Sequence, residues 1–256
     1  MNKQESRPLH MSPDIIIQEG ALFIADAHES SERSFFLEFL NHLLKTPPPQ
    51  LFLMGDMFDV FIGGIAYTKR IYKPYIKLIN DLSQMCEIFY FEGNHDFNLK
   101  KLFPKVHVIA IQQQPRKALF LDGTTCLLLH GDKYEKRLYR LYTAFIRHPV
   151  TLSVLNILDS CLCGGISKHM MKSQKRKQLC RPIADFKALV DTKIKDYPLK
   201  SIDFIAEGHY HQDTSFAYDG LCYTNFSSFA CTQSYFRITT TETTKFVSVL
   251  FKNTSL

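Results

Sequence analysis

The sequence of 256 residues predicts an α/β fold, because short apolar segments alternate with segments of helical periodicity. The apolar segments have the length and composition of buried strands, and several end in a cluster of polar residues. Between the first of them, apolar side chains recur at helical spacing over residues 35–44 and 72–83. Together these patterns indicate a sandwich of sheets and helices.

Five apolar runs are expected to form the central strands, with ligands collecting where each strand ends and its loop begins. In chain order they are Ala21–Ala25, Leu51–Met54, Ile88–Phe91, Leu127–Leu129 and Ile202–Ala206. The C-terminal third differs, since it is rich in Thr, Val, Phe and Tyr. Its segments 221–225, 235–239 and 246–251 predict antiparallel strands.

About 70 residues between the fourth and fifth runs carry no strand pattern. Apolar stripes at helical spacing cover residues 138–146 and 152–162, and a cationic segment follows them. We therefore expect one domain, residues 1–256, with a helical cap insertion at about 134–190. Each leucine taken alone is better explained as core, but stripes followed by a basic, acid-free segment favour an amphipathic surface.

The formal charge of +6 comes from a single segment. Between Ser160 and Ala184 there is no Asp or Glu, yet there are six Lys and Arg; without those six, 25 basic residues balance 25 acidic ones. A localised basic segment indicates an anionic partner, although a solvated helix face is the simpler explanation. No nucleic-acid-binding motif accompanies these cations.

The ends and the cysteines suggest a cytoplasmic protein. Residues 1–14 are polar and lack the apolar core of a signal peptide, and no stretch approaches the roughly 18 apolar residues of a membrane-spanning helix. The seven cysteines form no Cys-x-x-Cys pair, so we expect reduced thiols, mostly in the core.

Seven side chains at the five strand ends can each donate a lone pair to a metal ion. They are Asp26, His28, Asp56, Asn94, His130, His209 and His211. This set exceeds the need of one tetrahedral site and would serve two ions if one carboxylate bridged them. Imidazole and carboxylate without thiolate suit Mn²⁺, Fe or Zn²⁺ better than Ca²⁺.

The order of these motifs resembles the signature of calcineurin-like metallophosphoesterases. Here it reads Asp26-Ala27-His28, Gly55-Asp56, Gly93-Asn94-His95-Asp96, His130 and Gly208-His209-Tyr210-His211. The resemblance implies a four-layer α/β-β/α sandwich and two divalent metal ions, for which we expect Mn²⁺. It assigns one ion to Asp26, His28, Asp56 and His211, and the other to Asp56, Asn94, His130 and His209.

The resemblance also gives His95 a catalytic role, in which it stabilises or protonates the leaving group. Asp96 is expected either to orient His95 or to form an exposed salt bridge. In such a family, two cations about 3.5–4 Å apart activate water and clamp the phosphoryl oxygens.

Within the superfamily, the chain looks most like the UDP-2,3-diacylglucosamine pyrophosphohydrolases of lipid A synthesis. Residues 55–63 are similar to their Gly-Asp-x-Phe-x-x-Trp-Ile-Gly segment, and residues 93–99 to their Gly-Asn-Arg-Asp-Phe-x-Leu. The basic helical insertion occupies the position of their substrate-binding cap. The chain departs from the pattern at Phe61, Gly64 and His95.

This second resemblance implies hydrolysis of an acylated UDP-sugar to UMP and 2,3-diacylglucosamine 1-phosphate. It further implies peripheral binding to the inner face of a membrane, with no obligate protein partner. The expected substrate-binding cations are Lys168, Lys172, Lys175 and Arg176. One alternative is a phosphodiesterase or phosphatase acting on a soluble nucleotide or phosphoprotein, and another is a non-catalytic membrane-binding scaffold.

Overall fold

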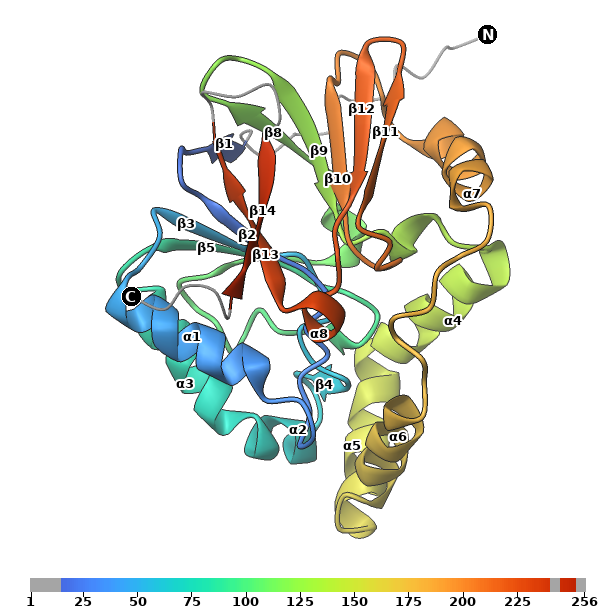
Figure 1. The fold of residues 1–256 in the computed structure, drawn as a ribbon. Coiled ribbons are helices and arrows are strands. Elements are labelled where there is room, and N and C mark those ends of the chain that lie inside the picture. The colour runs from blue at the N-terminus through green and yellow to red at the C-terminus, as the bar shows by residue number, and fades with distance from the viewer. Residues whose placement is uncertain (1–14, 240–244, 252–256) are drawn as a thin grey trace, which may run out of the picture.

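The computed structural model describes residues 15–239 and 245–251, and two six-stranded sheets lie at its centre (Figure 1). Sheet A contains, in spatial order, β1 (Ile15–Ile17), β8 (Arg116–Phe120), β9 (Thr125–Leu129), β10 (Phe204–Glu207), β12 (Leu221–Asn225) and β11 (Thr214–Tyr218). Sheet B contains β14 (Phe246–Leu250), β13 (Ser234–Ile238), β2 (Leu22–Ile24), β3 (Gln50–Leu53), β5 (Glu87–Phe91) and β7 (His107–Ile109). A separate pair joins β4 (Phe61–Ile62) to β6 (Asp96–Phe97).

Helices cover the outer faces of both sheets. On sheet B lie α1 (Phe35–Lys45) and α3 (Lys73–Leu82), and on sheet A lies α7 (Phe186–Lys193). The layers are thus helix, sheet, sheet and helix, which confirms the predicted four-layer α/β-β/α sandwich. The shorter elements are α2 (Ala66–Ile71), α8 (Phe229–Thr232) and the 3₁₀ helices Ile111–Gln113, Asp132–Tyr134 and Ile194–Asp196.

Aromatic side chains at one level of sheet B hold the two sheets together. Phe23, Phe52 and Phe89 are paired across three neighbouring strands and face sheet A. Their rings stack nearly parallel, with centroids 4.1 Å apart for Phe23 and Phe52 and 4.7 Å apart for Phe52 and Phe89. Leu51 and Leu53 point the other way, toward the helices. This alternation determines the register, because a slip by one residue would reverse every side chain.

The five apolar runs all form strands, and the helices expected at 35–44 and 72–83 are α1 and α3. The pair β13–β14 is antiparallel as predicted, and β12 pairs antiparallel with β11 and in parallel with β10, which extends sheet A. Six strands were not predicted from the sequence: β1, β4, β6, β7, β8 and β11. These strands are short or half-polar and therefore lack a distinct apolar run.

Between β9 and β10 the chain is helical and contains no strand over residues 130–203, all of which the structure describes. We call α4 (Arg137–Arg147), α5 (Pro149–Cys161) and α6 (Gly165–Lys175) the cap helices. Figure 1 shows α5 and α6 extending beyond the sandwich. The expected insertion of about 134–190 also takes in the start of α7, which packs on sheet A.

The apolar stripes of the cap helices lie largely on the surface. Leu138 is 81% exposed and Phe145 is 66% exposed, in agreement with an amphipathic surface. No single helix in the described ranges is long and apolar enough to cross a membrane; α5 and α6 meet that criterion only as a pair bent by 98°.

The expectation of reduced, mostly buried thiols is wrong for four cysteines. Cys180, between α6 and α7, forms a disulfide with Cys231 of α8. Cys161 and Cys163 are exposed, whereas Cys126 is buried. The bonded pair is separated by 51 residues, so only the folded chain brings them within bonding distance.

Candidate metal centre

The polar clusters that follow the five predicted strands meet at one end of the sandwich. Strands β2, β3 and β5 are parallel neighbours in sheet B, and β9 and β10 are parallel neighbours in sheet A. Because the carboxyl ends of parallel strands share one edge, the loops that leave them lie together. The potential metal ligands fall into two groups within this set of loops.

The first group consists of Asp26, His28 and His211, whose ligand atoms all lie within 4.8 Å of one another. Asp26 is fully buried, and its Oδ1 lies 3.1 Å from Nε2 of His211. The rings of His28 and His211 meet edge to face with centroids 5.2 Å apart. Side chains from both sheets therefore form this group.

The second group consists of Asp56, His130 and His209, again with ligand atoms within 4.8 Å of one another. Nε2 of His130 lies 3.4 Å from Asp56 Oδ2 and 3.4 Å from Asn94 Oδ1. The structure thus brings Asn94 beside this group, and all seven residues singled out in the sequence lie in or next to the two groups.

The backbone at most of these residues adopts a conformation that L-amino acids rarely take. The φ angles are 51° at Asp26, 42° at His28, 53° at Asp56, 67° at His209 and 60° at His211. Left-handed backbone at non-glycine residues is uncommon and costs free energy. Its repetition at five residues of two groups indicates a functional constraint on how these side chains point.

Glycines in the motifs leave the space that the ligand side chains occupy. A Cβ on Gly93 would lie 2.1 Å from Asp56 Oδ1, and one on Gly55 would lie 2.4 Å from His130 Nδ1. A Cβ on Gly208 would lie 2.6 Å from Asp26 Oδ2. No real Cβ approaches this closely, so each glycine is required by the adjacent ligand.

Backbone carbonyls determine which histidine nitrogens face the two groups. Nδ1 of His130 lies 3.0 Å from the Met54 carbonyl, and Nδ1 of His211 lies 2.8 Å from the Leu179 carbonyl. A carbonyl can only accept, so each Nδ1 carries a hydrogen and donates it. In a neutral imidazole, Nε2 then presents a lone pair to the nearby carboxylate.

A lone pair that faces a carboxylate is repulsive unless a proton or a metal ion lies between them. Burial lowers the pKa of His130, but the neighbouring Asp56 carboxylate outweighs burial and raises it to about 10. In the first group, Asp26 Oδ1 and His28 Nε2 have no hydrogen-bond partner among the described residues, while His28 Nδ1 lies 3.5 Å from Asp59 Oδ1. Buried polar atoms without partners are rare, and these point to a ligand. The donor set therefore fits one cation in each group.

His95 and Asp96 have different roles. Nδ1 of His95 donates to the Asp59 carbonyl at 2.7 Å, and its Nε2 lies 3.9 Å from Asp56 Oδ2. Asp96 is fully buried and accepts from the backbone N–H groups of Asp56, Met57 and Gly93. The expected exposed salt bridge is therefore wrong, since Asp96 joins two metal-site loops instead.

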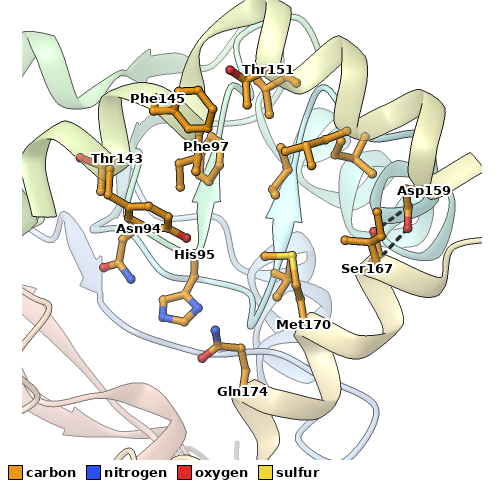
Figure 2. Close-up of a pocket in the computed structure, with 18 of the residues that line it drawn as sticks. Asn94, His95, Phe97, Thr143, Phe145, Thr151, Asp159, Ser167, Met170 and Gln174 are labelled. Atoms are coloured by element: carbon orange, nitrogen blue, oxygen red, sulfur yellow. Dashed lines mark hydrogen bonds between the residues drawn. The ribbon is translucent and has the colours of Figure 1, made fainter.

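A large cavity, which we call the apolar groove, opens beside His95. Its volume is about 670 Å³, and side chains of β4 and the cap helices form most of its wall, among them Ile62, Leu155 and Met170. Figure 2 shows His95, Phe145 and Met170 pointing into this space.

A second cavity of about 470 Å³ is lined by members of both metal-ligand groups, namely His28, His211, Asp56 and His209, and by Asn94. The two cavities share four lining residues: Asn94, His95, Tyr139 and Lys177. One molecule could therefore occupy both at once, with its reacting atoms near His95.

The predicted substrate-binding cations do not line either cavity. Lys175 is paired with Glu32 at 2.8 Å, and Lys168 donates to the Cys163 carbonyl at 3.0 Å. Neither these two nor Lys172 and Arg176 appear in the wall of the apolar groove or of the second cavity.

Two other cations of the same basic segment were missed. Lys177 lines both cavities and Arg181 lines the one with the metal groups. They lie in the non-helical stretch after α6, so helical spacing could not identify them. The density of charge in the segment was the only signal available.

Comparisons with known proteins agree with this geometry. The sequence profile of the calcineurin-like phosphoesterases matches residues 21–213. A protein from Pseudomonas syringae pv. tomato, named UDP-2,3-diacylglucosamine hydrolase, is 32% identical over 202 residues, which cover 75% of this chain and 79% of that protein. A protein of the same name from Shewanella sp. is 34% identical over 115 residues, 43% of this chain; the match spans about half that protein, 47% of its length.

Among solved structures, an archaeal phosphodiesterase superposes with a TM-score of 0.44 and 11% sequence identity. That superposition covers 90% of this chain and 98% of the archaeal one.

We predict that Gly93→Ala weakens metal binding, because the new Cβ must displace Asp56 Oδ1 and the Asp56 backbone nitrogen, which would lie 2.1 and 2.7 Å away. Disturbing a residue that supports a ligand lowers metal affinity by about 10–100-fold. Elemental analysis after equilibrium dialysis measures the bound metal. Gly165→Ala is the control, since its Cβ meets only Leu162 at 3.3 Å. Wild-type metal content in Gly93→Ala would contradict the role of this glycine.

Proposed function

Because this chain belongs to the calcineurin-like phosphoesterase family, we propose that it hydrolyses the pyrophosphate bond of UDP-2,3-diacylglucosamine in lipid A biosynthesis. The products would be UMP and 2,3-diacylglucosamine 1-phosphate. The names of the relatives from Pseudomonas and Shewanella support this substrate. The observation that carries the proposal is the junction of the apolar groove with the metal-ligand groups at His95.

The proposed substrate has two chemically different parts, and each matches one cavity. Acyl chains need a wide apolar surface, and the groove supplies about 670 Å³ with mainly apolar walls. A diphosphate needs concentrated positive charge, and the neighbouring cavity contains Lys177 and Arg181 beside the metal-ligand groups. A substrate without acyl chains would leave the apolar groove unfilled.

We assign one divalent ion to Asp26, His28, Asp56 and His211, and the other to Asp56, Asn94, His130 and His209, with Mn²⁺ as the metal. Two such ions, when bound, lower the pKa of water and neutralise charge that develops on phosphoryl oxygens. Asp56 suits the shared position because it contacts both groups: its Oδ2 lies 3.4 Å from His130 Nε2, and its backbone carbonyl accepts the His28 N–H at 3.0 Å, while its Oδ1 accepts the His95 backbone N–H at 2.8 Å. Both of its carboxylate oxygens are thereby held in place.

His95 is positioned to assist the leaving group. Its Nδ1–H bond to the Asp59 carbonyl fixes the ring, and Arg33 in turn holds the Asp59 carboxylate through two contacts of 2.8 and 2.7 Å. The opposite nitrogen, Nε2, lies 3.9 Å from Asp56 Oδ2, and His95 lines both cavities. When protonated, it can donate to the oxygen that leaves phosphorus.

We further propose that the protein binds peripherally to the cytoplasmic face of a bacterial membrane, where its substrate resides. Apolar side chains of α4 and of the end of α5 are exposed, with Leu138 81%, Phe145 66% and Leu162, the C-cap of α5, 61% accessible. An apolar face flanked by cations is typical of interfacial helices. In this arrangement Lys168, Lys172, Lys175 and Arg176 of α6 and its C-terminus would contact anionic headgroups rather than the diphosphate.

The central test is release of UMP from UDP-2,3-diacylglucosamine in the presence of Mn²⁺, followed by chromatography. We expect Asp56→Ala to lose bound metal and to lower turnover by about 10²–10³-fold or more. His95→Ala should lower turnover by about 10²–10⁴-fold with metal content retained. Intact substrate after incubation with the metal-loaded wild type would refute the proposed function. Metal loss in His95→Ala would instead make this residue a ligand.

We predict that Leu155→Asp selectively impairs the acylated substrate, because Leu155 lines the apolar groove. Loss of about 2 kcal/mol of apolar contact corresponds to about a 30-fold fall in kcat/KM. Ser153→Asp is the matched control on the same helix, since Ser153 is exposed and does not line the groove. Turnover of a small soluble phosphodiester should be unchanged in both variants. An equal effect on both substrates would contradict acyl binding in the groove.

Membrane binding is tested by sedimentation with anionic phospholipid vesicles. Phe145→Glu should reduce the bound fraction, since a carboxylate on the exposed face of α4 opposes insertion and is repelled by anionic lipids. Met85→Glu places the same charge on a side chain that is 52% exposed outside the cap helices. If both variants sediment like the wild type, α4 does not face the membrane.

A further inference from the structure

A buried lysine lies directly beneath two of the metal-site loops. Lys193 belongs to α7, and its side chain is only 7% exposed. Its Nζ donates to the carbonyl of Gly131 at 2.6 Å and to the hydroxyl of Tyr210 at 2.6 Å. The same nitrogen lies 4.2 Å from the centre of the Tyr210 ring.

Both hydrogen-bond partners are sequence neighbours of ligands in the second group. Gly131 follows His130 in the loop after β9, and Tyr210 lies in the loop after β10 between His209 and His211, the latter a member of the first group. Gly131 has a φ of 128° and His209 a φ of 67°, so neither loop follows a regular backbone path. Lys193 therefore joins the two irregular loops through hydrogen bonds. The rings of His130 and His209 in these loops lie 5.1 Å apart.

A buried carboxylate holds the lysine in place. Glu207 is fully buried at the end of β10 and lies 3.9 Å from Lys193 Nζ. It accepts a hydrogen bond from the Tyr197 hydroxyl at 2.6 Å and another from the hydroxyl of Tyr223. A charge buried this deeply must be paired and hydrogen-bonded, so the position of the ammonium is tightly determined.

The network continues from the lysine to the metal group itself. The Tyr210 hydroxyl, which accepts from Lys193, donates to Glu135 Oε1 at 2.5 Å. Glu135 Oε1 in turn lies 3.7 Å from His209 Nε2. A change at Lys193 can therefore reach His209 both through the backbone at Tyr210 and through this carboxylate.

We propose that Lys193, held by Glu207, is a positioning residue that sets the spacing of His130 and His209. This inference rests on the proposed ligand set and goes beyond the proposed reaction. Its consequence is unequal: the ion bound by Asp56, Asn94, His130 and His209 depends more on Lys193 than the other ion does. Lys193 reaches the ligands of this ion through Gly131, Tyr210 and Glu135, whereas it reaches the ligands of the other ion only through the backbone at Tyr210, which precedes His211.

The test uses Lys193→Met, which keeps the length of the side chain and removes its donors, and Mn²⁺ as the probe. In the variant we expect the ion held by His130 and His209 to bind about 10–100-fold more weakly and the other ion to be weakened less. Electron paramagnetic resonance should then change from the spectrum of a coupled manganese pair to that of an isolated ion. Lys195→Met is the control, since Lys195 is exposed two residues away.

Two results would contradict the role proposed for Lys193. Two ions bound with wild-type affinity in folded Lys193→Met would overturn the inference, as would equal weakening of both ions. If Lys193→Met does not fold, Tyr210→Phe replaces it, because this change removes only the hydroxyl that joins Lys193 to Glu135. Selective weakening of one ion in Tyr210→Phe, but not in Tyr218→Phe, supports the proposal, and unchanged binding overturns it.

No substrate is present in these measurements, so their outcome is independent of the proposed reaction. A wild-type protein that binds two Mn²⁺ ions but releases no UMP would refute the proposed substrate and leave the role of Lys193 intact. A wild-type protein that binds fewer than two ions would refute the ligand set and this inference with it.

Discussion

Lone pairs of nitrogen and oxygen face one another at the carboxyl edge of both sheets, and only positive charge between them makes that arrangement favourable. Nε2 of His211 faces Asp26 at 3.1 Å, and Nε2 of His130 faces Asp56 at 3.4 Å. The glycines that leave room for the ligands, the left-handed backbone at the ligands and the carbonyls that orient the imidazoles all serve this contact. These three features are what a site for divalent ions requires, since each controls where a ligand atom lies.

The metal-ligand groups and the apolar groove come from different parts of the chain. Loops of the sandwich supply the metal-ligand groups, whereas β4 and the cap helices form most of the apolar groove. Arg147 connects the two, since it extends from α4, donates to the Gly93 carbonyl at 2.7 Å and lies 4.9 Å from the Phe97 ring. In the function we propose, the family fold supplies the reaction on phosphate and the insertion supplies the surface that selects an acylated substrate.

The two candidate metal-ligand groups were predictable because their side chains sit in short motifs at the ends of strong apolar runs. The contacts of the Lys and Arg side chains in the basic segment could not be predicted from the sequence. Which way each side chain points depends on how α6 packs. Lys175 pairs with Glu32, while Lys177 and Arg181, beyond the helix, line the cavities. The Cys180–Cys231 disulfide and the Lys193–Glu207 pair were likewise out of reach, since each joins residues that only the folded sheets bring together.

The central claim is that the apolar groove and the metal centre act on one molecule. It is tested most directly by comparing kcat/KM of the Mn²⁺-loaded wild type for UMP release from UDP-2,3-diacylglucosamine and from UDP-glucosamine without acyl chains. Each buried methylene contributes about 0.8 kcal/mol, so the acylated substrate should be favoured by at least about 100-fold. Equal kcat/KM values for the two substrates would contradict the account.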